Sequence, residues 1–169
     1  YEIPKRDWSS DVCSSDLSED TIVAVATPPG RSAIGLVRFS GPLVRKIAEQ
    51  RLGGARLEAR RATVCKWLDA KGEALDEIVA VLFRAPHSYT GEDLLEISAH
   101  GSPLILERIV ADACAAGARA ARPGEFTLRA VSHGKLDLLQ AEAIRDFIAA
   151  QTFTQQQTAR SEEHTSELQ

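Results

Sequence analysis

The 169-residue sequence lacks several features that would place it in a special class of protein. It has no run of about 18 apolar residues, so it predicts no membrane-spanning helix. Its first residues also lack the apolar segment of a secretory signal peptide. Three cysteines, an odd number without metal-ligand spacing, argue against a disulfide framework and favour the reducing cytoplasm. With 44% hydrophobic and 26% charged residues, the chain has the composition of an ordinary globular protein.

Sequence motifs of common catalytic sites are missing as well. There is no G-x-x-x-x-G-K-[ST] loop for nucleotide phosphates and no paired Cys-x-x-Cys, so we expect neither a phosphate-binding loop of that kind nor a metal site. Cys65 and Cys114 fall in a predicted strand and a predicted helix, and we interpret them as core residues. His87, His100 and His133 adjoin turns, where surface or capping roles are expected. The sequence therefore assigns no catalytic residue.

The two ends of the chain differ from its middle. Residues 7–17 read DWSSDVCSSDL and residues 160–169 read RSEEHTSELQ. One coding choice for the first segment, read on the opposite strand, translates into the second, and this DNA segment resembles a sequencing-library adapter. We therefore interpret residues 1–19 and 160–169 as artefactual, disordered ends. Without residues 1–20 and 160–169, the formal charge changes from −4 to +2, which permits an anionic ligand without arguing for one.

The middle of the chain predicts an α+β domain. Strands are expected at residues 21–27, 34–39, 62–68, 78–83 and 94–98, and helices at about 42–52, 103–116 and 127–151, the last with a break at 133–135. Residues 69–72 have turn composition, so the third and fourth strands should form a hairpin. Because strands and helices do not alternate regularly, the order favours α+β with two or three helices.

The last predicted helix carries an apolar stripe. Its members are Leu136, Leu139, Ala143, Ile144, Phe147 and Ile148. Little of the chain remains to cover this stripe. We expect it to pack against a partner or against sequence that is not part of this chain.

Three charged residues occupy positions where charge is costly. Arg38 and Glu96 each lie inside an apolar strand, and Lys135 follows a glycine at the helix break. One interpretation is a half-exposed sheet face, or an ion pair between Arg38 and Glu96. The other is a polar pocket in which the carboxylate accepts two parallel N–H bonds from a guanidine-like ring edge, while Arg and Lys meet anionic groups of the ligand. Both interpretations remain open at this point.

Several blocks of sequence resemble, in order, the N-terminal domain of the MnmE (TrmE) family of tRNA-modification GTPases. The blocks are residues 20–24, 26–31, 38–41, 88–93, 95–96, 100–103, 121–127 and 135–144. The resemblance extends over residues 20–159. The segment after Arg31 departs from the family pattern, because it is less glycine-rich.

The resemblance implies a folate-binding and dimerisation domain at residues 20–135, followed by the start of a truncated helical domain at 136–159. The implied fold is the mostly antiparallel folate domain also found in aminomethyltransferases. The implied cofactor is a tetrahydrofolate derivative, 5-formyltetrahydrofolate, bound near a homodimer interface. The folate positions of the family fall on Arg38, Glu96 and Lys135. Glu96 would contact the pterin edge, and the two cations would contact the polar and anionic parts of the folate.

For an intact family member, the resemblance implies carboxymethylaminomethyl-type modification of the tRNA wobble uridine in the cytoplasm. Folate would supply the one-carbon unit, and a flavoprotein of the MnmG type would be the partner. The GTPase domain, which would bind GTP, magnesium and potassium, is absent from this sequence. We therefore expect the chain to bind folate and to form a homodimer, but not to hydrolyse GTP or to modify tRNA alone.

Two alternatives compete with this hypothesis. A stand-alone folate-dependent transferase of the aminomethyltransferase type would need its own acid or base, such as Glu125 or Asp93, and a longer chain. A dimerisation module without a ligand is the second alternative. The presence of Arg38, Glu96 and Lys135 argues against it.

Overall fold

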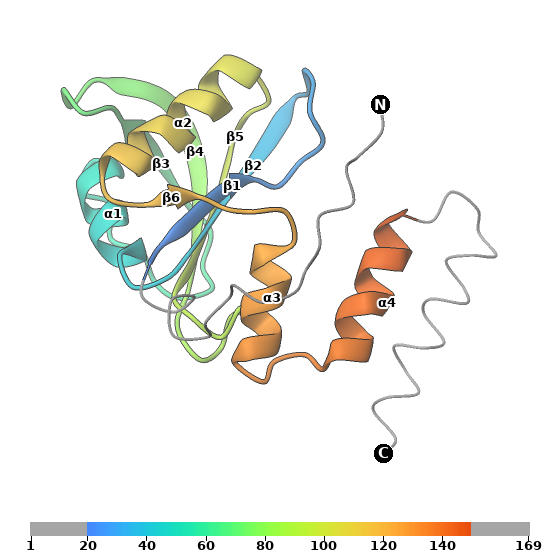
Figure 1. The fold of residues 1–169 in the computed structure, drawn as a ribbon. Coiled ribbons are helices and arrows are strands. Elements are labelled where there is room, and N and C mark those ends of the chain that lie inside the picture. The colour runs from blue at the N-terminus through green and yellow to red at the C-terminus, as the bar shows by residue number, and fades with distance from the viewer. Residues whose placement is uncertain (1–19, 150–169) are drawn as a thin grey trace.

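The computed structural model describes residues 20–149, in which six strands and four helices form one α+β domain (Figure 1). The strands are β1 (Ile22–Val25), β2 (Ile34–Ser40), β3 (Thr63–Leu68), β4 (Ala74–Phe83), β5 (Leu94–His100) and β6 (Arg119–Ala120), and the helices are α1 (Val44–Arg51), α2 (Pro103–Ala115), α3 (Glu125–Ser132) and α4 (Leu138–Ala149). The predicted α+β class is confirmed. The interpretation of residues 1–19 and 160–169 as artefactual ends concerns residues outside the described range, as does the predicted helix end at residue 151.

All six strands belong to a single sheet with the order β3-β4-β5-β2-β1-β6. The short β6 pairs with β1 in parallel, and every other neighbouring pair is antiparallel. Strands β3 and β4 form the predicted hairpin. Its turn is held by Asp69, whose Oδ1 accepts the backbone N–H groups of Lys71 and Glu73 at 2.8 and 3.0 Å. The mostly antiparallel sheet implied by the family resemblance is therefore observed.

Helices α1 and α2 pack on one face of the sheet and bury its core side chains. Phe39 of β2 stacks on Trp67 of β3 with ring centroids 5.9 Å apart, and Ile47 of α1 and Ile109 of α2 are fully buried in the same cluster. Because side chains alternate along a strand, the residues between these core positions point to the opposite face. We call this opposite side of β2, β3, β4 and β5 the open face. It exposes large apolar side chains, namely Ile34, Val64 and Val79.

The structure differs from the sequence prediction most clearly in three elements. Strand β4 begins at Ala74 rather than at residue 78, because pairing with β3 continues through Asp76 and Glu77 before the apolar run. The two-residue β6 was not predicted, since it is too short to carry a pattern. Helix α3 begins at Glu125, two residues before the start predicted from the sequence. The Glu125 carboxylate accepts the Arg122 backbone N–H at 2.7 Å, and Gly124 adopts a left-handed φ of 75°.

The predicted break near residue 134 separates α3 from α4, which lies beside α3 and away from the sheet (Figure 1). The predicted apolar stripe is partly exposed: Leu139, Phe147 and Ile148 are exposed, Leu136 and Ile144 are half-buried, and Ala143 is buried. The predicted domain boundary at residue 136 stays a prediction. No helix among residues 20–149 has the length and apolar character needed to cross a bilayer.

Candidate functional site

Arg38 and Glu96 form an ion pair on the open face. They lie directly opposite each other on the neighbouring strands β2 and β5. The Nε and Nη2 atoms of Arg38 donate to Glu96 Oε1 at 2.9 and 2.7 Å. The side chains are 27% and 25% exposed, so the pair is neither in the core nor freely solvated. The ion pair considered from the sequence is therefore observed, and it leaves both groups within reach of a ligand.

The two hydrogen bonds use only one oxygen of the carboxylate. Among the described residues, no donor reaches Glu96 Oε2. A carboxylate can accept two parallel N–H bonds, one on each oxygen. The second oxygen is therefore available to a ligand, while the first is occupied by Arg38.

Two aromatic rings flank the Arg38 guanidinium. Its Cζ lies 5.5 Å from the ring centroid of Tyr89 and 5.8 Å from that of Phe126, within the range of cation–π contact. Tyr89 belongs to the segment between β4 and β5, and Phe126 to the first turn of α3. The hydroxyl groups of Tyr89 and Thr127 are 2.9 Å apart and tie the two segments together. The rings thus line the same surface as the ion pair.

The sequence did not single out Tyr89 or Phe126 as site residues. Both lie inside blocks that carry the family resemblance, 88–93 and 121–127. Neither is charged, so an argument based on misplaced charge passes over them. Their position inside these blocks was the signal that could have identified them.

Lys135 lies near this group without touching it. Its backbone N–H donates to Ala130 O at 2.8 Å and closes the end of α3. Its stem packs on the loop before β5, because a Cβ added at Gly91 would lie 3.3 Å from Lys135 Cγ. Among residues 20–149, no hydrogen bond or ion pair joins Lys135 to the Arg38–Glu96 pair. The structure therefore pairs two of the three predicted residues and places the third on an adjoining segment.

A buried ionic cluster holds these segments in place. Arg129 of α3 is fully buried and donates to carboxylates of Asp20, Glu92 and Glu125 at 2.5, 3.1 and 3.3 Å. It also donates to the Asp20 carbonyl at 2.8 Å. The cluster thus joins α3 to the start of β1 and to the loop that carries Tyr89. Helix α3 and this loop are the two segments that carry the aromatic rings.

Glu125 is the most constrained carboxylate of that cluster. Burial alone would raise its pKa, but hydrogen bonds from Arg119 and from the Arg122 backbone lower the pKa of Glu125 to about 2. Burial would also raise the pKa of Asp93, but the hydrogen bonds from Arg45 and from the Ala85 backbone, together with the charges of Arg45 and Arg84, outweigh burial and lower the pKa. Both carboxylates named for the transferase alternative are therefore ionised and engaged by arginines. This arrangement does not favour either as a general base.

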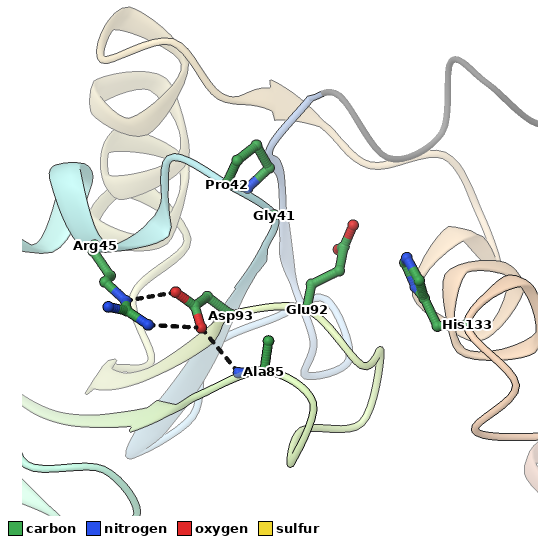
Figure 2. A pocket seen from close by; sticks show the side chains of 7 residues that line it. All are labelled: Gly41, Pro42, Arg45, Ala85, Glu92, Asp93 and His133. Carbon is green, nitrogen blue, oxygen red and sulfur yellow. Dashed lines mark hydrogen bonds and ion pairs between the residues drawn. The ribbon is translucent and has the colours of Figure 1, made fainter.

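A cavity of about 350 Å³ opens beside the same loop (Figure 2). Its lining residues are Gly41, Pro42, Arg45, Ala85, Glu92, Asp93 and His133. None of the three predicted site residues lines it. The Glu92 carboxylate is already bound by Arg129 and by the Ser40 hydroxyl, and His133 Nδ1 lies 2.8 Å from the Thr90 carbonyl. The cavity is thus walled by polar groups that have partners within the protein.

The remaining candidate nucleophiles and bases lie where the sequence predicted. Cys65 and Cys114 are half-buried against the core, and burial raises the pKa of the Cys65 thiol. His87, His100 and His133 are exposed. His100 is held by Asp76, with Nδ1 and Oδ1 2.7 Å apart. These residues have structural or surface roles in the described part of the chain.

The protein is thus an α+β domain with one mixed six-stranded sheet, and its open face carries the Arg38–Glu96 ion pair. A family model described as "GTP-binding protein TrmE N-terminus" matches residues 21–135. The chain is 53% identical over 146 residues to the tRNA modification GTPase MnmE of Koribacter versatilis (strain Ellin345), which covers 83% of this chain and 32% of that protein. It is 51% identical over 138 residues to the tRNA modification GTPase MnmE of Legionella pneumophila (strain Paris), covering 82% and 31%.

A third relative is the tRNA modification GTPase MnmE of Xanthomonas oryzae pv. oryzae (strain PXO99A), 53% identical over 133 residues, which cover 79% of this chain and 30% of that protein. The chain belongs to the TrmE N-terminal family, as its family model and these identities show. It spans about a third of the length of the curated relatives that it matches.

Proposed function

We propose that this domain binds a tetrahydrofolate derivative, 5-formyltetrahydrofolate, at the open face and forms a homodimer, as part of a longer GTPase that modifies tRNA. The observation that carries the proposal is the Arg38–Glu96 pair between two aromatic rings. A pterin ring is flat and presents a guanidine-like edge of parallel N–H donors. A carboxylate beside aromatic faces matches both properties.

The free Glu96 Oε2 is the expected first contact for the ring edge. A ring edge with two parallel N–H groups needs both carboxylate oxygens, and Oε1 already accepts two bonds from Arg38. We therefore expect Arg38 to yield at least one of these bonds when the ring binds. Tyr89 and Phe126 would keep its guanidinium nearby, where it can meet polar atoms of the ligand.

Lys135 would serve the anionic end of the folate. Its side chain is exposed and lies on the segment next to Tyr89, so it can reach a ligand that extends beyond the ring site. An ammonium group is a mobile point charge suited to a carboxylate held in solvent. When bound, the folate would supply the one-carbon unit for modification of the wobble uridine. The residues of this chain would bind and orient it.

The apolar side chains of the open face support the dimer. Ile34, Val64 and Val79 are 64%, 67% and 38% exposed on the same face as the ion pair. A second copy packed there would remove them from water and border the folate site. In the intact protein, an MnmG-type flavoprotein would be a further partner, and GTP would bind to the part that this chain lacks.

Folate binding is tested by calorimetric titration of the 169-residue chain with 5-formyltetrahydrofolate. Glu96→Gln keeps the shape of the side chain but removes the acceptor pair, so it should weaken binding by roughly 2–5 kcal/mol. Glu77→Gln removes the same charge from the same face and is the matched control. Phe126→Leu should weaken binding roughly two- to tenfold through the lost ring face. Saturable binding that both glutamate variants retain would contradict the site, and a folded wild type that does not bind would contradict the folate proposal.

Dimerisation is tested separately by sedimentation velocity. A Val64→Lys and Val79→Lys double variant should shift the chain to monomer, because it places charge in the proposed interface. Leu104→Lys is the matched control, since Leu104 is 78% exposed on α2, over the other face of the sheet. Equal association of the wild type and the double variant would contradict an interface at the open face.

A further inference from the structure

Three arginines meet at the end of the sheet where β4 leads into the following loop. Arg84 directly follows β4, and the His87 N–H donates to the Arg84 carbonyl at 2.8 Å to form a turn. The Arg60 guanidinium donates to the His87 carbonyl of this turn at 3.1 Å. On the other side, Asp93 accepts both the Ala85 N–H at 2.9 Å and Arg45 Nε at 2.6 Å. We call the group Arg45, Arg60 and Arg84 the arginine surface.

The arginine surface carries more positive charge than the residues around it neutralise. Arg45 is paired with Asp93, and the neighbouring Arg61 is paired with Glu58. Arg60 and Arg84 are exposed and form no ion pair among the described residues, although the charge of Arg84 helps to lower the pKa of Asp93, which Arg45 already holds. Arg84 at the start of the turn and Arg60 against its end therefore keep guanidinium donors available to solvent. Such a pair suits an anionic partner with oxygens in planar pairs.

Arg60 is also held in a backbone conformation that arginine rarely adopts. Its φ is 62°, which makes it the only residue other than glycine with positive φ among residues 20–149. Its N–H donates to the Leu82 carbonyl at 2.7 Å, which fixes this conformation against the last residues of β4. A glycine would fit here without strain. The presence of a long cationic side chain at a strained position points to a use for that side chain.

The chemistry of the surface distinguishes between two kinds of anionic partner. Protein interfaces usually have an apolar centre inside a polar rim. The large hydrophobic side chains exposed in the described part of the chain are Val25, Ile34, Val64, Val79, Leu104, Leu128, Leu138, Leu139, Phe147 and Ile148. None belongs to the arginine surface or to its turn. A charged surface without an apolar centre fits a nucleic-acid backbone better than a protein.

We propose that the arginine surface binds the phosphate backbone of RNA, with Arg60 and Arg84 as the two principal contacts. The identity of the RNA as tRNA rests on the proposed role in tRNA modification. Contacts of this kind position an RNA without reading its sequence. The surface adjoins the start of the loop that also carries Tyr89, so a bound RNA would lie near the proposed folate site.

The test measures binding of the 169-residue chain to an in vitro transcribed tRNA by fluorescence anisotropy across a range of salt concentrations. The Arg60→Gly and Arg84→Gln double variant should lose two phosphate contacts. Each contact contributes about 0.7–0.9 to the salt slope, so the slope should become shallower by about 1.4–1.8, and affinity near 0.1 M salt should fall roughly 25- to 60-fold. An Arg31→Gln and Lys71→Gln double variant is the matched control, because these residues lie in exposed turns at the opposite end of the sheet.

Affinity that falls equally in both double variants would overturn the proposal, because the attraction would then depend only on net charge. Absence of binding by the wild type near 0.05 M salt would overturn it as well. Unlabelled competitors are compared at equal charge. If a poly-glutamate peptide displaces the labelled tRNA better than unlabelled RNA does, the surface would instead be assigned to an acidic protein. The folate titration is repeated on the arginine variants, which should bind 5-formyltetrahydrofolate like the wild type. Failure of the RNA proposal and failure of the folate proposal are therefore distinguishable, because each is read from its own titration.

Discussion

Arg38 and Glu96 face each other across β2 and β5, and both guanidinium donors converge on a single carboxylate oxygen. The pair lies between core residues of its own strands yet points away from the core. Its geometry stabilises the sheet face while it leaves one oxygen unused. If the pair mainly stabilised the fold, the two guanidinium donors would be expected to form parallel bonds, one to each carboxylate oxygen.

The contribution of this pair to folding should be small. Because both side chains are about a quarter exposed, solvent screens their attraction. A double-mutant cycle with Arg38→Gln and Glu96→Gln should give a coupling free energy of about 0.5–1 kcal/mol in urea unfolding. A coupling several times larger would show that the pair is primarily a structural element of the sheet.

Arg129 should be far more important for stability. It is fully buried and is the only guanidinium in the described residues that contacts three carboxylates, those of Asp20, Glu92 and Glu125. Arg129→Met keeps much of the side-chain volume but leaves those charges without their central partner. We expect a loss of about 3–5 kcal/mol in the free energy of unfolding. The control Arg145→Met, on the exposed side of α4, should change it by less than about 0.5 kcal/mol. Similar small effects in both variants would contradict the central position of Arg129.

The sequence predicts the fold better than it predicts the site. Strand alternation and turn composition are local, so the hairpin, the class and the exposed stripe of α4 could be derived from them. The sequence offered an ion pair between Arg38 and Glu96 as one of two interpretations, but it could not choose between them, because the contact depends on the register of two strands far apart in the chain. Arg129 illustrates the same limit. From the sequence of its short amphipathic helix, Arg129 would be assigned to the surface. Its burial is explained by ion pairs with Asp20 and Glu92, which are distant from it in the sequence.

Acid should destabilise the domain through Glu125. Its pKa is lowered from 4.5 to about 2 in the folded state, so the folded protein holds its proton more weakly than the unfolded chain does. The resulting stability, at most about 3 kcal/mol, is fully present above pH 4.5 and is lost as the pH falls toward 2. Asp20 and Asp93, whose pKa values are also lowered, act in the same direction.

The measurement is the free energy of unfolding as a function of pH for the wild type and for Glu125→Gln. The variant should be less stable near pH 7, because it weakens the contact with Arg119. It should also lose less stability between pH 4.5 and 2, since one titrating group has been removed. Parallel pH profiles would show that Glu125 does not carry the acid sensitivity.

Gly41 should tolerate no side chain, for steric reasons that can be separated from backbone strain. Its φ is 127°, and an added Cβ would lie 2.6 Å from the Asp20 carbonyl oxygen and 2.8 Å from Thr21 Cα, both of them backbone atoms. Gly134 also has a positive φ, 66°, but a Cβ added there would meet no atom within 4 Å. Gly134→Ala should therefore cost only about 1 kcal/mol from backbone strain. Gly41→Ala should cost about 2–4 kcal/mol, because the segment that leads into β1, Asp20 and Thr21, must move as well. Thermal and urea unfolding of the two variants measure the difference, and equal losses would show that the close approach of this segment is not constrained by Gly41.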